Sequence, residues 1–151
     1  MSIWGPGPFE NDDGADWFVD LRDEPSLDSI AEALDEVSDA AHIGYVEVTD
    51  AAEAIAAAEV LAELLGSPGD EFALGEGHEQ VVEALQSELQ GQSGPDIRTL
   101  IKQAIDALEV ILNDVENSEL RQMWEEDAEG MAAWAGAMIR LQQRLRLIAV
   151  S

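Results

Sequence analysis

The sequence predicts an all-α fold, a compact bundle of six to seven helices that forms a single helical domain over residues 1–151. Three observations predict it. Apolar residues recur at spacings of three and four along most of the chain. Breaks rich in Gly, Ser and Pro at 66–69 and 91–95 separate these periodic segments. The length of 151 residues is that of one ordinary domain, long enough to bury a core without disulfides, and the chain has no cysteine.

The first helix follows an irregular loop of Trp, Gly and Pro at residues 4–9. We expect Asn11 or Asp12 to cap this helix, because the free N–H groups of a first turn need side-chain acceptors. Acidic residues in the first turns suit such a start as well. The helix should run to about Arg22, and Pro25 should end it.

A second helix should begin after Ser26 as its N-cap. Its apolar stripe consists of Leu27, Ile30, Leu34 and Val37. Residues 43–48 are of β type but short and isolated, so they form either an extended connection or one short strand. An Ala-rich third helix then starts at Thr49 or Asp50 and runs to Leu65, and its alanines permit close helix approach.

Four more helices complete the bundle. The fourth spans about 78–89, and the fifth spans about 97–115 with Pro95 placed at a first helical position. Ser118 should cap a short sixth helix, and the last helix should run over about 129–148. We expect the fifth and last helices to be central, because their stripes are the clearest. The last carries a packing seam of Met131, Trp134, Met138, Leu141, Leu145 and Ile148.

Charge is the strongest compositional signal. The chain holds 33 acidic and 7 basic residues, for a formal net charge of −26. Residues 1–96 contain 24 of the acids and a single base, Arg22, whereas residues 97–151 contain nine acids and six bases. This field repels nucleic-acid phosphates and anionic lipid headgroups, and it attracts cations and basic proteins. We therefore expect neither nucleic-acid nor membrane binding.

The acidity could also have an origin unrelated to a basic partner. A salt-adapted or acidic proteome gives many Asp and Glu with few Lys, and Lys102 is the only lysine here. Selection for solubility would give the same surface. An acidic helical protein could also imitate DNA and occupy a DNA-binding protein. The chain opens without a signal peptide and lacks the roughly 18 apolar residues that span a bilayer, so we expect a cytoplasmic protein.

The opening of the chain carries its most specific motif. Residues 4–17 read W-G-P-G-P-F-E-N-D-D-G-A-D-W and resemble the W-G-x-G-x-F-[DE]-N-D-x-A-x-D-[WF] opening of the bacterial domain-of-unknown-function family 4259. The Ala/Glu-rich run 51–65 and the segment 118–124, S-E-L-R-Q-M-W, are similar to that family as well. Gly14 stands where the family more often has alanine. The resemblance implies a small helical bacterial protein of the cytoplasm with no established activity.

This motif has two interpretations. As a folding device, its aromatic residues would anchor the loop to the bundle, its glycines would allow tight turns, and its Asn and Asp would cap the next helix. As a binding site, it would meet a ligand or partner through Trp4, Gly5, Gly7, Phe9, Glu10, Asn11, Asp12, Asp16 and Trp17. The burial of the tryptophans separates the two, because exposed Trp is unusual on a monomer.

The sequence assigns no catalytic residue, metal site or cofactor. It contains no nucleophile elbow, phosphate loop or dinucleotide motif, and the lack of cysteine excludes thiol catalysis. Asp12, Asp16 and Asp20 share one helix face at spacings of four, and carboxylates at this density suit Mg²⁺ or Ca²⁺. The alternative function is thus a divalent-metal-binding or metal-dependent hydrolytic protein that uses this N-terminal carboxylate cluster.

The leading expectation is a small acidic protein that binds other proteins and is not an enzyme. Its partner would be a basic protein, drawn in by the negative field. Several uncharacterised families of this size include immunity proteins that neutralise toxins, so a toxin-immunity role is an analogy that fits. The seam over 131–148 would also allow a homo-oligomer.

Overall fold

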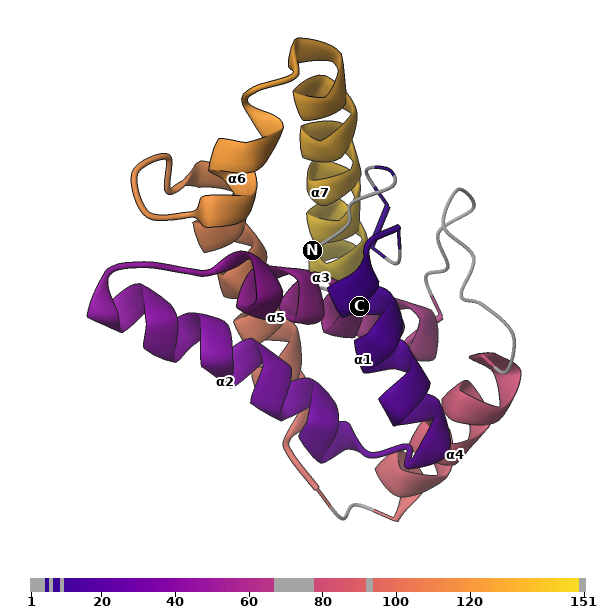
Figure 1. The fold of residues 1–151 in the computed structure, drawn as a ribbon. Coiled ribbons are helices and arrows are strands. Elements are labelled where there is room, and N and C mark those ends of the chain that lie inside the picture. The colour runs from indigo at the N-terminus through magenta and orange to yellow at the C-terminus, as the bar shows by residue number, and fades with distance from the viewer. Residues whose placement is uncertain (1–4, 6, 9, 67–77, 92–93, 150–151) are drawn as a thin grey trace.

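The computed structural model describes residues 5, 7, 8, 10–66, 78–91 and 94–149 (Figure 1). Within them the chain forms a bundle of seven helices, which confirms the predicted all-α class. The helices are α1 (Asp12–Asp23), α2 (Leu27–Ile43), α3 (Val48–Leu64), α4 (His78–Gln90), α5 (Ile97–Asn113), α6 (Glu119–Trp124) and α7 (Ala128–Ala149). The predicted loop at 4–9 and the breaks at 66–69 and 91–95 lie partly outside the described residues.

Three of the predicted N-caps are confirmed, whereas the expected helix start at Thr49 or Asp50 is wrong, because α3 begins at Val48 after Glu47. The side chain of Asn11 accepts a hydrogen bond from Gly14 N at the start of α1. Ser26 caps α2 and Ser118 caps α6 in the same way, each by accepting from a backbone N–H of the first turn. These helix starts follow from short-range chemistry, because an N-cap acts on an N–H two or three residues away.

The central helix is α3, whereas the sequence pointed to the fifth and last helices. It contacts every other helix of the bundle, and 13 of its 17 residues are buried. A helix that is apolar on all sides is a buried one. The alanines of α3 are short enough to let neighbouring helices approach from all around it, so its apolar side could not be identified from the stripe pattern.

α2 and α5 pack against each other and run in the same direction, with α5 behind α2 in the view of Figure 1. Near their beginnings, Leu27 and Ile97 line the same groove. About two turns further on, Asp35 Oδ1 accepts a hydrogen bond from Gln103 Nε2 at 2.7 Å. The two helices therefore end at the same end of the molecule.

Residues 43–48 form no strand in the described chain. Ile43 still belongs to α2 and Val48 already belongs to α3, so only residues 44–47 connect the two helices. Val46 pairs with Ser118 in an isolated parallel bridge. The β-type residues here have one bridge partner and no second strand, and the surrounding helices decide the fold of the segment.

The boundaries of α5 differ from the prediction at both ends. Pro95 does not occupy the first helical position, because Asp96 is the N-cap and the helix begins after it. At the other end α5 stops at Asn113, and Val115 lies beyond the helix with half of its surface exposed. The reason is Asp114, whose side chain accepts from the backbone of the following turn and so competes with helix continuation.

The seam predicted on the last helix packs within the chain itself. Trp134, Met138, Leu141 and Leu145 are all buried, and α7 contacts α3, α5 and α6. The large apolar side chains that α7 leaves exposed are Ile139 and Leu147, which lie off this seam. No helix in the described part of the chain combines the length and apolarity needed to cross a membrane.

Candidate functional site

Glu10 of the N-terminal motif closes the loop that precedes α1. Its Oε1 accepts a hydrogen bond from Gly7 N at 2.9 Å, and its backbone carbonyl accepts one from Gly5 N at 3.2 Å. An added Cβ at Gly5 would lie only 2.6 Å from the Glu10 carboxylate, so only glycine fits there without a shift. The carboxylate of Glu10 is therefore committed to the loop's own backbone.

Asn11 ties this loop to α1 by two hydrogen bonds. Its Oδ1 accepts from Gly14 N at 2.7 Å, and its Nδ2 donates to the carbonyl of Pro8 at 3.4 Å. Gly14 is buried, and a Cβ on it would lie 2.5 Å from that same carbonyl. Gly14 thus stands at a close approach of the loop to the helix.

The loop packs over a pair of tryptophans. The rings of Trp124 and Trp134 stack at 6.4 Å between centroids and 12° between planes. Gly5, Gly7, Pro8 and Asn11 line, together with this pair, a void of about 10 Å³, at the lower limit of space for one water. The described loop residues thus pack against tryptophans of α6 and α7, whereas the folding-device interpretation named the motif's own aromatic residues as the anchors. Trp17 is half-buried against the core, whereas Trp4 and Phe9 lie outside the described residues.

The carboxylates that converge are not those of the motif. Asp16 and Asp20 are exposed on α1, and Asp12 is half-buried at its start. Among the described residues, the carboxylate oxygens that lie within 4.8 Å of one another come from α2 and α3. They belong to Glu36 of α2 and to Asp50 and Glu53 of α3.

Repulsion within this carboxylate cluster changes its protonation. Burial, followed by the charges of Glu36, Asp50 and Asp13, raises the pKa of Glu53 to about 7. Burial and the charge of Asp50 also raise the pKa of Glu36. Asp13 belongs to α1, and its Oδ2 accepts a hydrogen bond from Thr49 Oγ1 at 3.3 Å, which brings a third helix to the cluster. Near neutral pH, Glu53 is thus partly protonated and can donate to Glu36.

The sequence offered only a weak signal for this cluster. Asp50 and Glu53 are spaced by three and so share a face of α3, which is visible in the sequence. Glu36 joins them only because α2 packs against α3, a contact that no local pattern predicts. In a chain with 33 acidic residues, such a pair does not stand out.

A second ionic feature lies in the core. Glu59 is one of three buried polar or charged residues in the described chain, together with Ser118 and Gln142. Its carboxylate pairs with Arg144 of α7. The pair joins the central helix to α7, which gives it a structural role.

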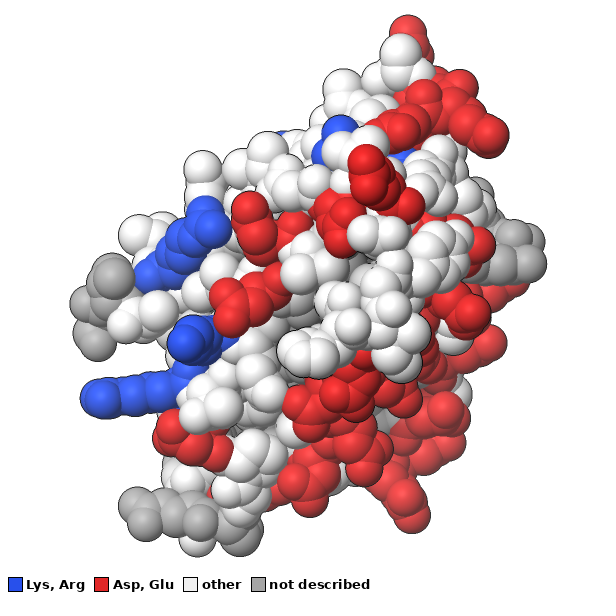
Figure 2. Space-filling model, turned by 90° about the vertical axis from the view of Figure 1, so that its left-hand side faces the viewer, with Lys and Arg blue, Asp and Glu red and all other residues white. Residues whose placement is uncertain are grey.

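Charge on the described surface is divided between helices. α1 and α2 carry five carboxylates each, and the two helices together hold one Lys or Arg residue, Arg22 of α1. α5 and α7 together carry five of the seven basic residues and only three acids. Figure 2 shows Asp and Glu concentrated over the right-hand and lower parts of one face, with most of the visible Lys and Arg at its left edge and a few near its top. The molecule therefore has an acidic side and a more cationic side.

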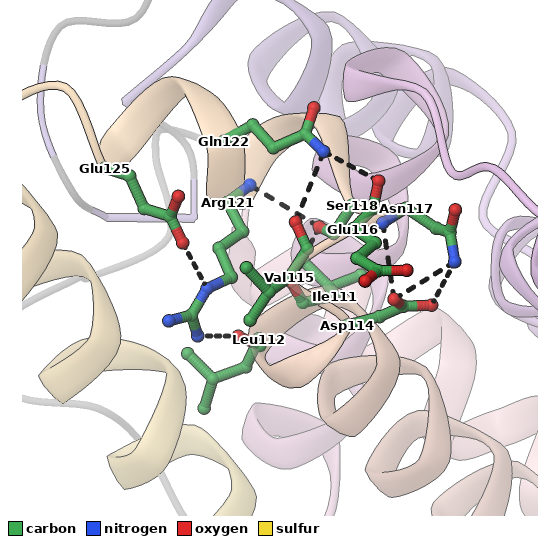
Figure 3. Close-up of polar contacts among 10 residues, drawn as sticks. All are labelled: Ile111, Leu112, Asp114, Val115, Glu116, Asn117, Ser118, Arg121, Gln122 and Glu125. Atoms are coloured by element: carbon green, nitrogen blue, oxygen red, sulfur yellow. Dashed lines mark hydrogen bonds and ion pairs between the residues drawn. The ribbon is translucent and has the colours of Figure 1, made fainter.

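The turn between α5 and α6 is held by a dense hydrogen-bond network (Figure 3). Ser118 Oγ donates to the carbonyl of Ile111 at 2.7 Å, and Asp114 accepts from the backbone and side chain of Asn117. Gln122 Nε2 donates to the carbonyls of residues 115 and 116 at 3.2 and 2.8 Å. Arg121 donates to the carbonyl of Leu112 and pairs with Glu125.

Three apolar side chains stand exposed beside this turn, at the end of the bundle where α2 and α5 finish. Ile43 is 87% exposed, Val115 is 49% exposed and Tyr45 is 41% exposed. Each lies within three residues of the Val46–Ser118 bridge, and we call these three residues the end patch. Partial desolvation, then the hydrogen bond to and charge of Glu119, raise the pKa of Tyr45, so its hydroxyl lies beside that carboxylate.

Comparison with known proteins identifies a family without an assigned activity. A family model described as a domain of unknown function (DUF4259) matches residues 2–137. No curated protein matches the chain. No solved structure matches it either.

Proposed function

We propose that this chain, which belongs to the DUF4259 family of unknown function, is a non-enzymatic bacterial module. It binds a basic protein partner in the cytoplasm. The observation that carries the proposal is the division of charge. Ten carboxylates and one basic side chain lie on α1 and α2, whereas most basic residues lie on α5 and α7.

The physical consequence is an oriented negative field. A basic protein is attracted to the α1–α2 side and less strongly to the opposite side, so it arrives in a preferred orientation. Such steering speeds association and weakens as salt screens the charges. Toxin-immunity proteins are an analogy for such a module, and a toxin is one class of basic partner that the proposal covers.

Affinity capture on the immobilised chain tests this function. Lysate of the source organism is applied at about 50 mM and about 500 mM NaCl, which changes the screening length about threefold. We expect a basic protein to be retained at low salt and released at high salt. Recovery of no protein at either salt contradicts the proposal.

A pair of matched variants makes this test specific. Asp16, Asp20 and Glu32 are exposed on α1 and α2, and their conversion to the corresponding amides should abolish capture. Glu126, Asp127 and Glu129 are exposed around the start of α7, and the same conversion there removes as much charge. Capture should survive in this second variant, because the oriented field of α1 and α2 is intact.

Binding of a divalent cation is the second candidate function, favoured by the convergence of Glu36, Asp50 and Glu53. Carboxylate oxygens are the ligands that Mg²⁺ and Ca²⁺ prefer. Calorimetric titration with Mg²⁺, Mn²⁺ or Ca²⁺ tests it at about pH 8, above the raised pKa of Glu53. A one-site isotherm that is lost in Glu53→Gln and kept in Asp16→Asn supports this candidate, and the absence of an isotherm in the unmodified chain rejects it.

A further inference from the structure

We propose that the end patch is the anchoring point of the basic partner, and that it receives a segment in which an apolar side chain stands between Lys or Arg residues. The inference rests on the proposed function and adds to it a location and a chemical pattern. It starts from the end patch itself, Ile43, Tyr45 and Val115, which come from the end of α2, its connection to α3 and the turn before α6.

The chain around the end patch is rich in carboxylates, and the nearest base in sequence is Arg121, which pairs with Glu125. The segments 39–47 and 114–119 that carry it contain no Lys or Arg. They contain five carboxylates, at Asp39, Glu47, Asp114, Glu116 and Glu119. Figure 2 views the side on which these segments lie: uncharged and acidic atoms are interspersed across the middle of that face, acidic atoms dominate below and to the right, and basic atoms lie at the left edge and near the top. An apolar centre within an acidic surround complements an apolar side chain flanked by cations.

The backbone beneath the patch is fixed before any partner arrives. Val46 N donates to the carbonyl of Asn117 at 2.8 Å, and Glu119 N donates to the carbonyl of Val46 at 3.0 Å. Glu119 also caps α3, because its Oε1 accepts from Val48 N at 2.8 Å. Together with the turn network of Figure 3, these bonds hold the two segments side by side. A pre-organised surface loses little conformational freedom on binding, which favours affinity.

Tyr45 suits the role of an anchor. Its ring is amphipathic, and its hydroxyl lies beside the carboxylate of Glu119. A Lys or Arg of the partner could therefore contact the ring face and the carboxylate together. Tyr is among the residues that most often dominate interface energetics.

Charge also decides between occupants. A second copy of the chain that presented the same patch would bring like charges together, and its net charge is −26. Nucleic acid and anionic lipid are repelled for the same reason. A basic protein segment is the occupant that the surrounding carboxylates attract.

Two synthetic peptides of equal charge test the inference. One is an amphipathic peptide of about 14 residues made of Lys and Leu, and the other has Ser in place of every Leu; binding of each to the full chain is measured by calorimetry. We expect the Leu–Lys peptide to bind about tenfold more tightly or better, because only it can fill the end patch. The double variant Ile43→Ser, Val115→Ser should lose this preference. Ile139→Ser, which alters an exposed apolar residue of α7, should keep it.

The outcomes separate the two levels of the proposal. If the unmodified chain prefers the Leu–Lys peptide and the double variant retains that preference, the end patch is not the anchor, although the acidic binding function stands. If the unmodified chain binds neither peptide, the proposed function fails and the inference fails with it. A light-scattering mass of twice 16.3 kDa that falls to 16.3 kDa in the double variant would show that a second copy covers the patch.

Discussion

Glu59 on α3 and Arg144 on α7 form a bidentate ion pair. Glu59 Oε1 accepts from Arg144 Nη1 at 2.9 Å, and Glu59 Oε2 accepts from Arg144 Nη2 at 2.6 Å. The side chain of Glu59 is 1% exposed and that of Arg144 is 17% exposed. A carboxylate removed from water this completely needs a cation and hydrogen bonds, because its desolvation costs several kcal/mol. The two parallel bonds also fix the rotation of α7 on the central helix.

Removing the arginine should expose this dependence. Arg144→Met leaves Glu59 buried without its cation, and we expect a loss of about 3–5 kcal/mol in the free energy of unfolding. Urea unfolding followed by helical circular dichroism measures it. Arg146→Met, at an exposed position of the same helix, should change stability by no more than about 0.5 kcal/mol. The double variant Glu59→Met, Arg144→Met should recover most of the loss, and equal costs for the two single arginine variants would contradict the role of the pair.

Glu53 should make stability depend on pH. Its pKa is about 7 in the folded chain against an ordinary value of 4.5, so between these values the folded chain holds a proton that the unfolded chain has released. The stability from this proton is fully present below about pH 4.5 and is lost as pH rises through about 7. The effect should be about 1–2 kcal/mol, since Glu53 is only half-buried and solvent screens its neighbours.

Glu53→Gln isolates this contribution from the net charge of the whole chain. Its stability relative to the unmodified protein should rise between about pH 5 and pH 8, as measured by urea midpoints. Asp16→Asn removes one carboxylate at an exposed position of α1 and serves as the matched control. Parallel pH curves for Glu53→Gln and the unmodified chain would show that the cluster holds no proton near neutrality.

Ser118 should matter more than an ordinary helix cap. It is fully buried, its Oγ donates to the carbonyl of Ile111, and it accepts from Arg121 N. Ser118→Ala leaves both groups without this partner and should cost about 2–3 kcal/mol. Ser26→Ala, which removes a more exposed cap, should cost about 1 kcal/mol. Chemical denaturation of both variants gives the comparison, and a smaller loss for Ser118→Ala would rule out the buried double role.

Gly14→Ala sets helix propensity against packing. Alanine normally stabilises a helix relative to glycine by up to about 1 kcal/mol. Here the new Cβ would lie 2.5 Å from the carbonyl of Pro8, so we expect a loss of about 1–3 kcal/mol instead. Tryptophan fluorescence should change at the same time, because the loop covers Trp124 and Trp134. A gain in stability with unchanged fluorescence would mean that the loop does not dock on α1.

The features predictable from sequence are those set by neighbours along the chain. Asn11, Ser26 and Ser118 cap helices as expected, because a cap needs only a side-chain acceptor and an N–H two or three residues later. The amphipathic segments became helices for the same local reason. The family could also be recognised from contiguous segments of the sequence, and its model matches residues 2–137.

The unpredicted features depend on which helices meet. Glu36 reaches Asp50 and Glu53 only through the packing of α2 on α3. Glu59 lies in a run of alanines and apolar residues. Its burial depends on the ion pair with Arg144 of α7, which no local pattern in the sequence predicts. The end patch combines residues that are about 70 positions apart in sequence, brought together by the parallel course of α2 and α5.

Amide hydrogen exchange of the full chain, with and without saturating Leu–Lys peptide, tests the proposed function most directly. Binding at the end patch predicts that protection increases in segments 39–47 and 114–119, and that exchange in the second half of α7 is unchanged. Protection centred on α7, or spread evenly over all exposed acidic segments, would contradict a defined docking site for a basic partner.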